Sequence, residues 1–383
     1  MEDALSGITT EVAVHAANPS FCGDMLSGLK IFITRSRSAM ILNAARTGLH
    51  RYIRSVAKAR NAGFYIATPL LQSPLSSVIG TIDVKFKMEN LQVSGSFKDR
   101  GIGNMIQSLS DSSSISRLIC SSGGNAGLSV ATIGKRIGLP VDVYVPVTTL
   151  PMMITKLKQR GASVYVAGEN WNDADLIARK SLAEDPSARY IPPYDDPLIW
   201  EGHSSIVDEL ETSLPESERP DVIVLSVGGG GLLAGIQQGL DRIGWDSVRI
   251  LAVETEGAAS FAAAKAAGEV VRLEKISTVA SSLGALSVTA AVLDINSRAV
   301  QRTESYVVSD AEAVSACIEF ANEQRCLVEP ACGACLAAIY SPRCRDYLIG
   351  GIKSSDCLKV VVIVCGGSVV SLDLLTSWKE KYL

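Results

Sequence analysis

Short runs of aliphatic and β-branched residues, each followed by a turn and a helix-like stretch, constrain the fold of this 383-residue chain more than any other feature. Beyond residue 63 these runs are 118–120, 141–145, 163–167, 222–227, 249–253 and 360–364. Strands that are apolar along their whole length are typical of a parallel sheet, because helices cover both of its faces. The runs fall into two groups, so the sequence predicts an α/β protein with two open, mostly parallel-sheet domains and a cleft between them.

The composition fits a globular enzyme and argues against several other classes. Apolar residues make up 47% and charged residues 20% of the chain, which rules out a largely disordered protein. The formal charge of −4 gives no reason to expect a nucleic-acid or membrane-surface partner. No apolar run reaches the roughly 18 residues that a membrane-spanning helix needs. The three histidines, His15, His50 and His203, are too scattered for a histidine-based metal site.

The nine cysteines do not form a disulfide framework, because their number is odd and their spacing is irregular. Reduced thiols are therefore expected. Cys332 and Cys335 match the C-x-x-C pattern, with Cys344 nearby, but no second pair follows at the spacing of a zinc ribbon. We expect these thiols to pack a buried helix, with a metal or redox site as the alternative.

The N-terminal segment has a composition of its own. Residues 25–63 contain no acidic residue, and lysines and arginines alternate there with aliphatic residues and serine. Such a composition is typical of a mitochondrial transit peptide. However, the segment starts at Met25 and acidic residues precede it, so a basic amphipathic extension is an equal alternative. Residues 1–62 therefore carry no fold prediction, and we expect a cytoplasmic protein with the mitochondrial matrix as the alternative.

Four glycines follow one of the predicted strands in LSVGGGGLLAG, residues 225–235. A strand, four glycines and a helix start present backbone N–H groups to an anion at the positive end of a helix dipole, which predicts phosphate binding. The loop is not a P-loop, because no Gly-Lys-Ser/Thr follows. A dinucleotide site is a serious alternative, since Gly229, Gly231 and Ala234 satisfy G-x-G-x-x-A. Glu254 ends the next strand, where that motif has an acidic residue.

One lysine, Lys98, lies within the Ser/Gly-rich stretch VSGSFKDRG, residues 93–101. An exposed turn lysine is the simplest interpretation. The alternative is an amine that forms a Schiff base with a carbonyl cofactor, which needs a tight loop and easy deprotonation. Two further polar turns favour this alternative, namely Ser121–Gly127 with its Asn125, and Cys365–Ser368 after a predicted strand. A dinucleotide enzyme needs neither turn.

Together these features suit pyridoxal phosphate as the cofactor. Lys98 would bind its aldehyde and residues 228–231 its phosphate. Asn125 would contact the ring hydroxyl, and Cys365 the ring nitrogen.

The motifs S-x-S-F-K-D-R-G, S-S-G-G-N-A-G, G-G-G-G-L and C-G-G-S, in this order, resemble those of the fold-type II pyridoxal-phosphate enzymes, which have the tryptophan synthase β-like fold. More narrowly, the chain resembles the catabolic L-serine/L-threonine dehydratases. IPPYDDPLIWEGHSSI, LVEPACGA and VVIVCGGS are close to the wording of that subgroup. The resemblance covers residues 63–383. It departs from the subgroup at Ser368, where asparagine is frequent, and at Ser282, where alanine is usual.

The resemblance implies a division of the chain and a set of site residues. Residues 63–91 together with 199–383 would form a large cofactor-binding domain, and residues 92–198 a small one, with the cofactor in the cleft between them. The implied cofactor-binding residues are Phe97, Lys98, Asn125, Gly228, Gly229, Gly230, Gly231, Ser282 and Cys365. The implied substrate-binding residues are Ser122, Gly123 and Asn125.

The resemblance also implies the chemistry. Lys98, displaced from the cofactor by the substrate amine, would remove the α-proton as the catalytic base, and the serine or threonine hydroxyl would leave. The products would be ammonia and either pyruvate or 2-oxobutanoate, as in amino-acid catabolism. A neutral Cys365 at the ring nitrogen weakens the electron sink, which favours elimination over transamination. The alternative from another class is a protein that binds pyridoxal phosphate without turnover.

Gly123 distinguishes the chain from related serine racemases. At this position the racemases carry a serine that acts as the base on the opposite face of the cofactor. Glycine offers no group for proton transfer, so we expect racemisation to be slight or absent.

A monovalent cation site is a further implication of the resemblance. Glu254, together with the backbone carbonyls of Ala258, Leu283 and Ala285, would bind potassium beside the phosphate loop and stiffen it. The alternative for Glu254 is a strand-end carboxylate that bonds to nearby backbone.

Other properties are expected on the same grounds. A homodimer is the usual state of the family. We interpret His203, Asp195 and Asp196 as structural. We expect no appended amino-acid-sensing domain, because only residues 369–383 follow the terminal loop.

Overall fold

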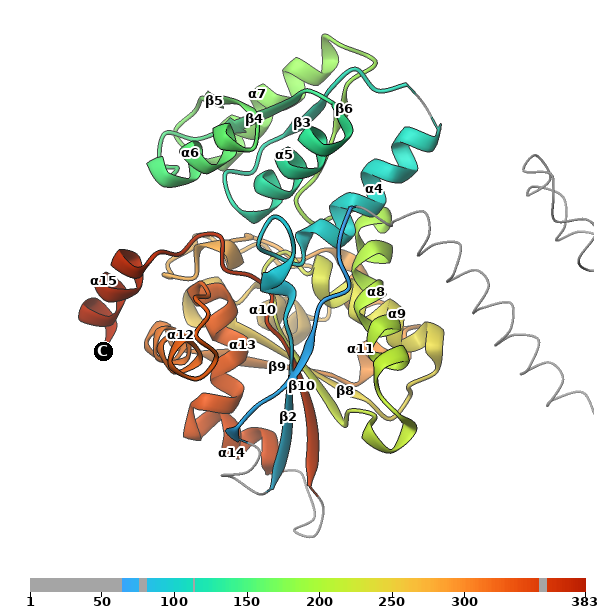
Figure 1. The fold of residues 1–383 in the computed structure, drawn as a ribbon, viewed down its shortest axis with the longest axis vertical. Helices are drawn as coiled ribbons and strands as arrows, with labels where there is room; N and C mark the ends of the chain where they lie inside the picture. The colour runs from blue at the N-terminus through green and yellow to red at the C-terminus, as the bar shows by residue number, and fades with distance from the viewer. Residues whose placement is uncertain (1–63, 76–80, 113, 351–356) are drawn as a thin grey trace, which may run out of the picture. The chain divides into compact units, whose positions relative to one another are not determined.

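The computed structural model describes residues 64–75, 81–112, 114–350 and 357–383. Within them, two separate sheets lie one above the other in the view of Figure 1, and helices pack around each. The predicted fold class, with two open and mostly parallel α/β sheets, is confirmed. We call each sheet with its helices a lobe, large or small. The basic segment 25–62, as well as His15 and His50, lies outside the described residues.

The sheet of the large lobe has six strands in the order β1-β2-β10-β7-β8-β9. They are β1 Leu70–Gln72, β2 Ile82–Lys87, β7 Val222–Ser226, β8 Arg249–Thr255, β9 Thr303–Val308 and β10 Leu358–Ile363. All neighbours pair in parallel except β1, which runs antiparallel to β2 at one edge. The residues of β7 are buried along its whole length, which explains its uninterrupted apolar sequence.

The sheet of the small lobe has four parallel strands in the order β5-β4-β3-β6. They are β3 Leu118–Cys120, β4 Val141–Val145, β5 Ser163–Val166 and β6 Arg189–Tyr190. Because all four fall between β2 and β7 in the sequence, the small lobe is an insertion into the large one. β3 and β4 are buried, whereas β5 lies at the edge and is mostly exposed.

Helices cover both sheets, and α5 to α7 lie around the small one in Figure 1. The helices are α4 Lys98–Ser112, α5 Asn125–Ile137, α6 Pro151–Gln159, α7 Trp171–Ala183, α8 Pro197–Ser213, α9 Gly231–Ile243, α10 Ser260–Ala267, α11 Arg298–Gln301, α12 Asp310–Gln324, α13 Pro330–Tyr340, α14 Pro342–Ile349 and α15 Leu372–Tyr382. Capping boxes start α7, with Asn170 and Asp173, and α12, with Ser309 and Glu312. Among the helices in the described ranges, none is long and apolar enough to cross a membrane.

Each strand that the sequence predicts is present, with small differences at its ends. The predicted runs do not include β1, β2, β6 and β9. β2 alternates apolar residues with Asp83 and Lys85, so it is not an uninterrupted apolar run. β1 and β6 are too short to show a periodicity, and β9 mixes Thr, Glu and Ser with apolar residues because it is half-exposed at a sheet edge. The residue boundaries of the two domains stay a prediction.

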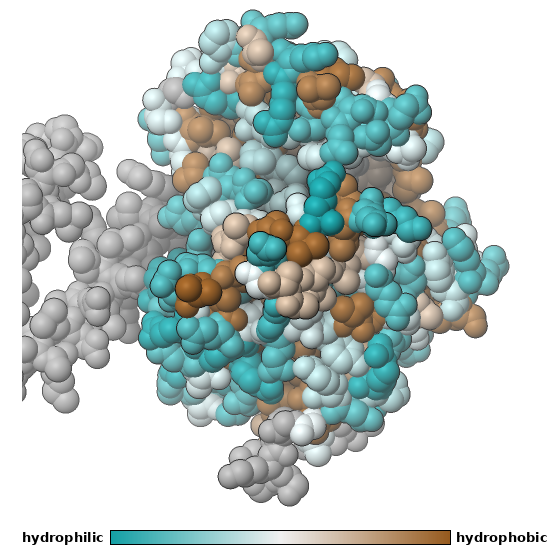
Figure 2. Space-filling view, turned by 180° about the vertical axis from the view of Figure 1, so that it is seen from behind, coloured by the Kyte–Doolittle hydropathy of each residue, from teal (hydrophilic) through white to brown (hydrophobic). Residues whose placement is uncertain are grey.

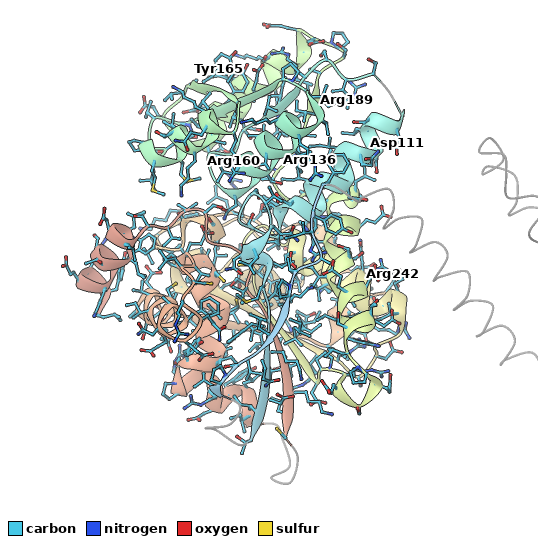
Figure 3. The ribbon with its side chains drawn as sticks, in the orientation of Figure 1. Asp111, Arg136, Arg160, Tyr165, Arg189 and Arg242 are labelled. Carbon is cyan, nitrogen blue, oxygen red and sulfur yellow. The ribbon has the colours of Figure 1, made fainter. Side chains whose placement is uncertain are left out.

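Side chains of α6 and of Arg160, which directly follows this helix, connect the small lobe to loops beside the large sheet. Arg160, which Figure 3 labels on the lower side of the upper lobe, donates to the carbonyl of Val93 at 3.1 Å. Lys156 donates to the carbonyl of Ser368 at 2.6 Å. Within the large lobe, Arg242, also labelled in Figure 3, extends from α9 and bonds to Ser204 of α8 at 2.8 Å.

A buried ionic network lies beside the first turns of α4. Arg100 is fully buried and donates to both carboxylate oxygens of Glu89 at 2.7 Å. It also donates to Glu209 at 2.7 and 2.8 Å, and Lys87 reaches the same carboxylate at 2.5 Å. Burial opposes the charge of Arg100, but Glu89 and Glu209 hold its pKa above the ordinary value. The network joins β2, α4 and α8, and it therefore fixes the helix that begins at Lys98.

We expect Arg100→Met to lower the free energy of unfolding by about 3–5 kcal/mol, because it leaves the fully buried carboxylate of Glu89 without its main partner and Glu209 with Lys87 alone. Chemical denaturation of the apoprotein measures this. Arg298→Met is the control, since Arg298 forms a surface pair with Asp246 and such pairs contribute about 0–1 kcal/mol. Equal losses in the two variants would contradict a special role for the buried network.

Candidate active site

The loop before Lys98 pairs with the terminal loop that follows β10. The backbone N–H of Phe97 donates to the carbonyl of Cys365 at 3.0 Å, and that of Gly367 donates to Gly95 at 3.1 Å. Gly95 has φ +93°, a conformation that favours glycine, and a Cβ on it would lie 2.4 Å from Oγ of Ser368. These contacts explain why both loops consist of small residues. They bring Lys98 and Cys365, far apart in the sequence, to one place.

Lys98 is the first residue of α4, which corrects the prediction of a lysine within a turn. The turn ends at Phe97, so the backbone of Lys98 belongs to the first turn of the helix. It donates to the carbonyl of Pro193 at 2.5 Å and lies 5.0 Å from the centre of the Phe97 ring. Burial lowers the pKa of Lys98 to about 8, although Cys365, Cys120 and Glu329 oppose this shift. Lys98 is not the freely exposed lysine of the simplest interpretation.

The lowered pKa of Lys98 predicts how cofactor uptake depends on pH. Only a neutral amine attacks an aldehyde, and this amine becomes neutral as the pH rises through about 8 instead of 10.5. We expect the rate at which the apoprotein takes up pyridoxal phosphate to rise with pH and to reach half of its maximum near pH 8. Stopped-flow absorbance measures it. A midpoint near 10.5 would show that water surrounds the amine.

The four glycines connect β7 to α9, as the phosphate prediction requires. Gly230 has φ +86° and precedes the helix, which begins at Gly231. A Cβ on Gly229 would lie 2.4 Å from the ring of Tyr194, and one on Gly231 would lie 2.7 Å from the Tyr194 carbonyl. Trp200 donates its indole N–H to that carbonyl at 2.9 Å and holds the Tyr194 segment in place. No side chain caps α9 at Gly230, so the backbone N–H groups at the start of the helix are available to a phosphate.

The loop with Ser122, Gly123 and Asn125 connects β3 to α5 in the small lobe. A Cβ on Gly127 would lie 1.8 Å from the carbonyl of Ser122, so the loop can turn this tightly only because residue 127 is glycine. At Gly123 a Cβ would lie 2.8 Å from Cγ2 of Thr149. α5 has no side-chain cap at Gly124, which leaves backbone N–H groups for an anion such as a substrate carboxylate.

Asn125 connects this loop to the large lobe. Its Nδ2 donates to the carboxylate of Glu329 at 2.7 Å and approaches Oγ of Ser282 at 3.5 Å. Its Oδ1 is buried and has no partner among the described residues. Ser282 in turn lies against the glycine loop, since a Cβ on Gly228 would be 3.2 Å from the Ser282 carbonyl. All the predicted cofactor residues therefore belong to one connected set of loops.

Cys365 follows β10, two residues beyond its end, and its thiol is buried. Its pKa lies well above the ordinary value: a hydrogen bond with Cys332 lowers it, but a hydrogen bond with Cys335 and burial outweigh that effect. The thiol is therefore neutral. Cys332 and Cys335 are buried within α13, as the packing interpretation of the C-x-x-C pattern requires. The eight cysteines within the described ranges are free thiols.

Glu254 follows the backbone interpretation more closely than the cation interpretation. Its two carboxylate oxygens accept the N–H groups of Phe261 at 2.7 Å and Ala262 at 2.8 Å, at the start of α10. Burial raises the pKa of Glu254 to about 7 against these two bonds. The described residues contain no cluster of three or more His, Cys, Asp or Glu that could hold a metal. The cation site with Ala258, Leu283 and Ala285 stays a prediction.

His203 and the Asp195-Asp196 pair have structural surroundings. His203 is buried between α4 and α9, against Gly101 and Gly235, and burial lowers its pKa well below the ordinary value, with Lys98 and Arg100 adding to the shift. Its ring lies 4.9 Å from that of Phe97. Asp196 accepts the N–H of Leu198 at 2.8 Å and caps α8.

Three residues of the site have no signal in the sequence that points to their role. Pro193 supplies the carbonyl that faces Lys98, Tyr194 covers the glycine loop, and Glu329 holds Asn125. All three lie in the stretches IPPYDD and LVEPACGA, whose wording matches the dehydratases. Only the resemblance to the dehydratases could have identified these three residues as part of the site.

These residues fit pyridoxal phosphate. The glycine loop before α9 packs against Tyr194, and the carbonyl of the preceding Pro193 accepts a hydrogen bond from Lys98, whose pKa is lowered and which lies within electrostatic reach of the neutral Cys365 thiol. The unpartnered Oδ1 of Asn125 supplies an acceptor where a ring hydroxyl needs one. A bound dinucleotide would give Lys98, Asn125 and Cys365 no function.

Comparison with known proteins agrees with this site. A family model described as pyridoxal-phosphate dependent enzyme matches residues 62–366. The chain therefore belongs to the pyridoxal-phosphate dependent enzymes.

Within that class, the chain is similar to proteins that act on hydroxy amino acids. It is 44% identical over 317 residues to the L-serine dehydratase/L-threonine deaminase of Homo sapiens, covering 83% of this chain and 95% of the relative. A fungal L-serine ammonia-lyase from Rhizomucor miehei has 37% identity and a TM-score of 0.75, over 84% of this chain and 99% of that one. Maize serine racemase has 27% identity and a TM-score of 0.74, over 85% and 95%.

Proposed function

We propose that this chain is a pyridoxal-phosphate-dependent ammonia-lyase that converts L-serine and L-threonine into ammonia and pyruvate or 2-oxobutanoate. The observation that carries the proposal is Lys98. Its amine has a pKa of about 8 and lies in contact with Pro193, within electrostatic reach of the Cys365 thiol. An amine that loses its proton near neutral pH suits both carbonyl chemistry and general-base catalysis.

The loops of the chain would hold the cofactor and the substrate. When bound, pyridoxal phosphate supplies an aldehyde for an amine and a ring that accepts electron density. The N–H groups at the start of α9 would hold its phosphate, and Asn125 and Cys365 would contact its ring. Ser122 and the uncapped start of α5 would bind the substrate carboxylate.

Lys98 would perform the proton transfer. Once the substrate amine has replaced it, the lysine is free and neutral, and it takes the α-proton of the substrate. Burial disfavours the charged form of the amine, so Lys98 can pass this proton on, and the substrate hydroxyl departs as water. The Pro193 carbonyl accepts a hydrogen bond from Nζ and thereby orients it.

Serine racemisation is a second candidate, because maize serine racemase has a similar fold. A racemase needs a second proton-transfer group on the opposite face. Gly123 has none, and the space beside it is filled by Thr149, which a Cβ at residue 123 would approach within 2.8 Å. Elimination is therefore the favoured reaction.

The test is to purify the protein with pyridoxal phosphate and record its visible spectrum before and after adding L-serine, while pyruvate and D-serine are measured. We expect a yellow protein whose spectrum changes and which forms pyruvate but little D-serine. A yellow protein without pyruvate would support a binding protein, and D-serine as the main product would support a racemase. A colourless protein that binds NAD would contradict the cofactor assignment.

Two further properties belong to the proposal. We propose a homodimer as the functional unit; hydrophobic residues gather near the middle of the face shown in Figure 2, where a second copy could cover them. Sedimentation velocity measures whether the protein is a dimer in solution.

We propose the cytoplasm as the compartment, with the mitochondrial matrix as the alternative that the composition of segment 25–62 leaves open. Cell fractionation of the full chain separates these two.

A further inference from the structure

Glu329 is a buried carboxylate to which the proposed reaction gives no task. Its exposed fraction is 3%, and it directly precedes α13 without capping that helix. Burial raises its pKa, while bonds from Ser282, Val369 and Asn125 oppose this. A carboxylate in such a place costs free energy unless its hydrogen bonds compensate for lost water. The pattern of those bonds shows what the side chain does.

Three loops of the site meet at this carboxylate. One oxygen accepts Nδ2 of Asn125 from the start of α5 at 2.7 Å. The other accepts the backbone N–H of Val369 at 3.0 Å, just beyond the terminal loop that carries Cys365. The hydroxyl of Ser282, whose backbone lies against the phosphate loop, bonds to the same carboxylate. Glu329 therefore links the small lobe, the terminal loop and the wall of the phosphate loop.

These contacts determine how Asn125 presents its amide. Both oxygens of Glu329 accept hydrogen bonds, one of them from the fixed backbone N–H of Val369, and the NH2 end of Asn125 therefore faces this group. The same Nδ2 lies 3.5 Å from Oγ of Ser282, which gives its second hydrogen a partner as well. The oxygen Oδ1 then remains as the one polar atom of this side chain without a partner among the described residues.

Two simpler roles for Glu329 do not fit its contacts. A helix cap would accept N–H groups from the first turn of α13, and no such side-chain bond exists. A charge partner for Lys156 would contact that amine, but Lys156 donates to the carbonyl of Ser368.

We propose that Glu329 is a positioning residue that acts through Asn125. It fixes the amide so that Oδ1 faces the cofactor ring and accepts a hydrogen bond from the ring hydroxyl. The inference rests on the binding of pyridoxal phosphate in the proposed function. It gives the carboxylate no contact with substrate and no part in proton transfer.

The test compares cofactor affinity and the absorption spectrum of the holoenzyme, without substrate, for wild type and Glu329→Gln. Glutamine keeps the size of the glutamate side chain, but its NH2 group must face either Val369 or Asn125. The bond that fixes the Asn125 amide is then lost, and that amide can rotate. We expect the cofactor dissociation constant to rise about tenfold, the size of one lost bond to a charged group. The released amide can offer N–H to the ring oxygen, so the long-wavelength band should grow at the expense of the short one. Ser282→Ala should move the bands in the same direction by less.

Non-additivity is the sharper criterion. If Glu329 acts through Asn125, adding Glu329→Gln to Asn125→Ala should change the dissociation constant by no more than about twofold. Full additivity, or unchanged bands in Glu329→Gln, would overturn the proposal.

Glu312→Gln is the matched control. Its carboxylate bonds to Ser309, Ser341 and Arg343 and to none of the site loops, so it should lower the thermal stability of the apoprotein and leave the bands unchanged. All these measurements omit substrate, so they are independent of the pyruvate assay. If the wild type formed no pyruvate, the proposed function would fail, but the binding and spectral data would still test the role of Glu329.

Discussion

Lys98→Ala is expected to abolish both the covalent attachment of pyridoxal phosphate and the formation of pyruvate. The two losses have one cause, because the same amine binds the aldehyde and takes the α-proton. Loss of a general base alone costs roughly 10²- to 10⁴-fold in rate, and loss of the attachment should bring turnover to the detection limit. Arginine should fail equally, since its guanidinium stays protonated. Pyruvate assays and absorption spectra measure both losses.

Lys85→Ala provides the matched control for this result. Lys85 on β2 forms ion pairs with Asp83 of the same strand and with Glu218, and it has no contact with the site, so its loss should leave turnover unchanged. Reduction of the wild-type holoenzyme with borohydride should fix the cofactor to the peptide that contains Lys98. A label on any other lysine would refute the assignment of Lys98, regardless of the activity of the variants.

Gly229→Val is expected to produce a folded protein that does not retain the cofactor. A Cβ at residue 229 would lie 2.4 Å from the Tyr194 ring, so either the ring or the loop must move. The backbone N–H groups of the loop would then lose their alignment towards the phosphate. Losing two hydrogen bonds to a charged group costs about 3–6 kcal/mol, or roughly 10²- to 10⁴-fold in affinity. Equilibrium dialysis with pyridoxal phosphate measures the loss.

Gly244→Ala separates this local effect from a general loss of stability. Gly244 ends the same helix α9 with φ +73°, and a Cβ there would meet nothing within 4 Å. Alanine at that place is strained by about 1–2 kcal/mol, but it should retain the cofactor with wild-type affinity. Weak cofactor binding in Gly244→Ala, or wild-type affinity in Gly229→Val, would mean that the glycine loop does not hold the phosphate.

The sequence by itself determined the fold class and the main groups of the site. Uninterrupted apolar runs such as 222–227 can be recognised as strands because a strand covered on both faces has apolar residues at every position. The glycine loop and Lys98 can be recognised as candidates because each lies at a tight turn directly before a helix, and such a turn is a local feature of the sequence. The short strands β1 and β6 carry no such pattern.

Only the tertiary structure decided how these groups are held. The bond between Asn125 and Glu329 joins residues that are 204 positions apart, and that between Lys98 and Pro193 joins residues 95 apart. No periodicity records such partners, because they depend on how the lobes pack and not on neighbouring residues. The lowered pKa of Lys98 also has no signal in the sequence, because it arises from burial. The partners of Glu254 have none either, since its oxygens accept backbone N–H groups at the start of α10. Local patterns therefore name the reactive groups, whereas long-range packing sets their protonation and orientation.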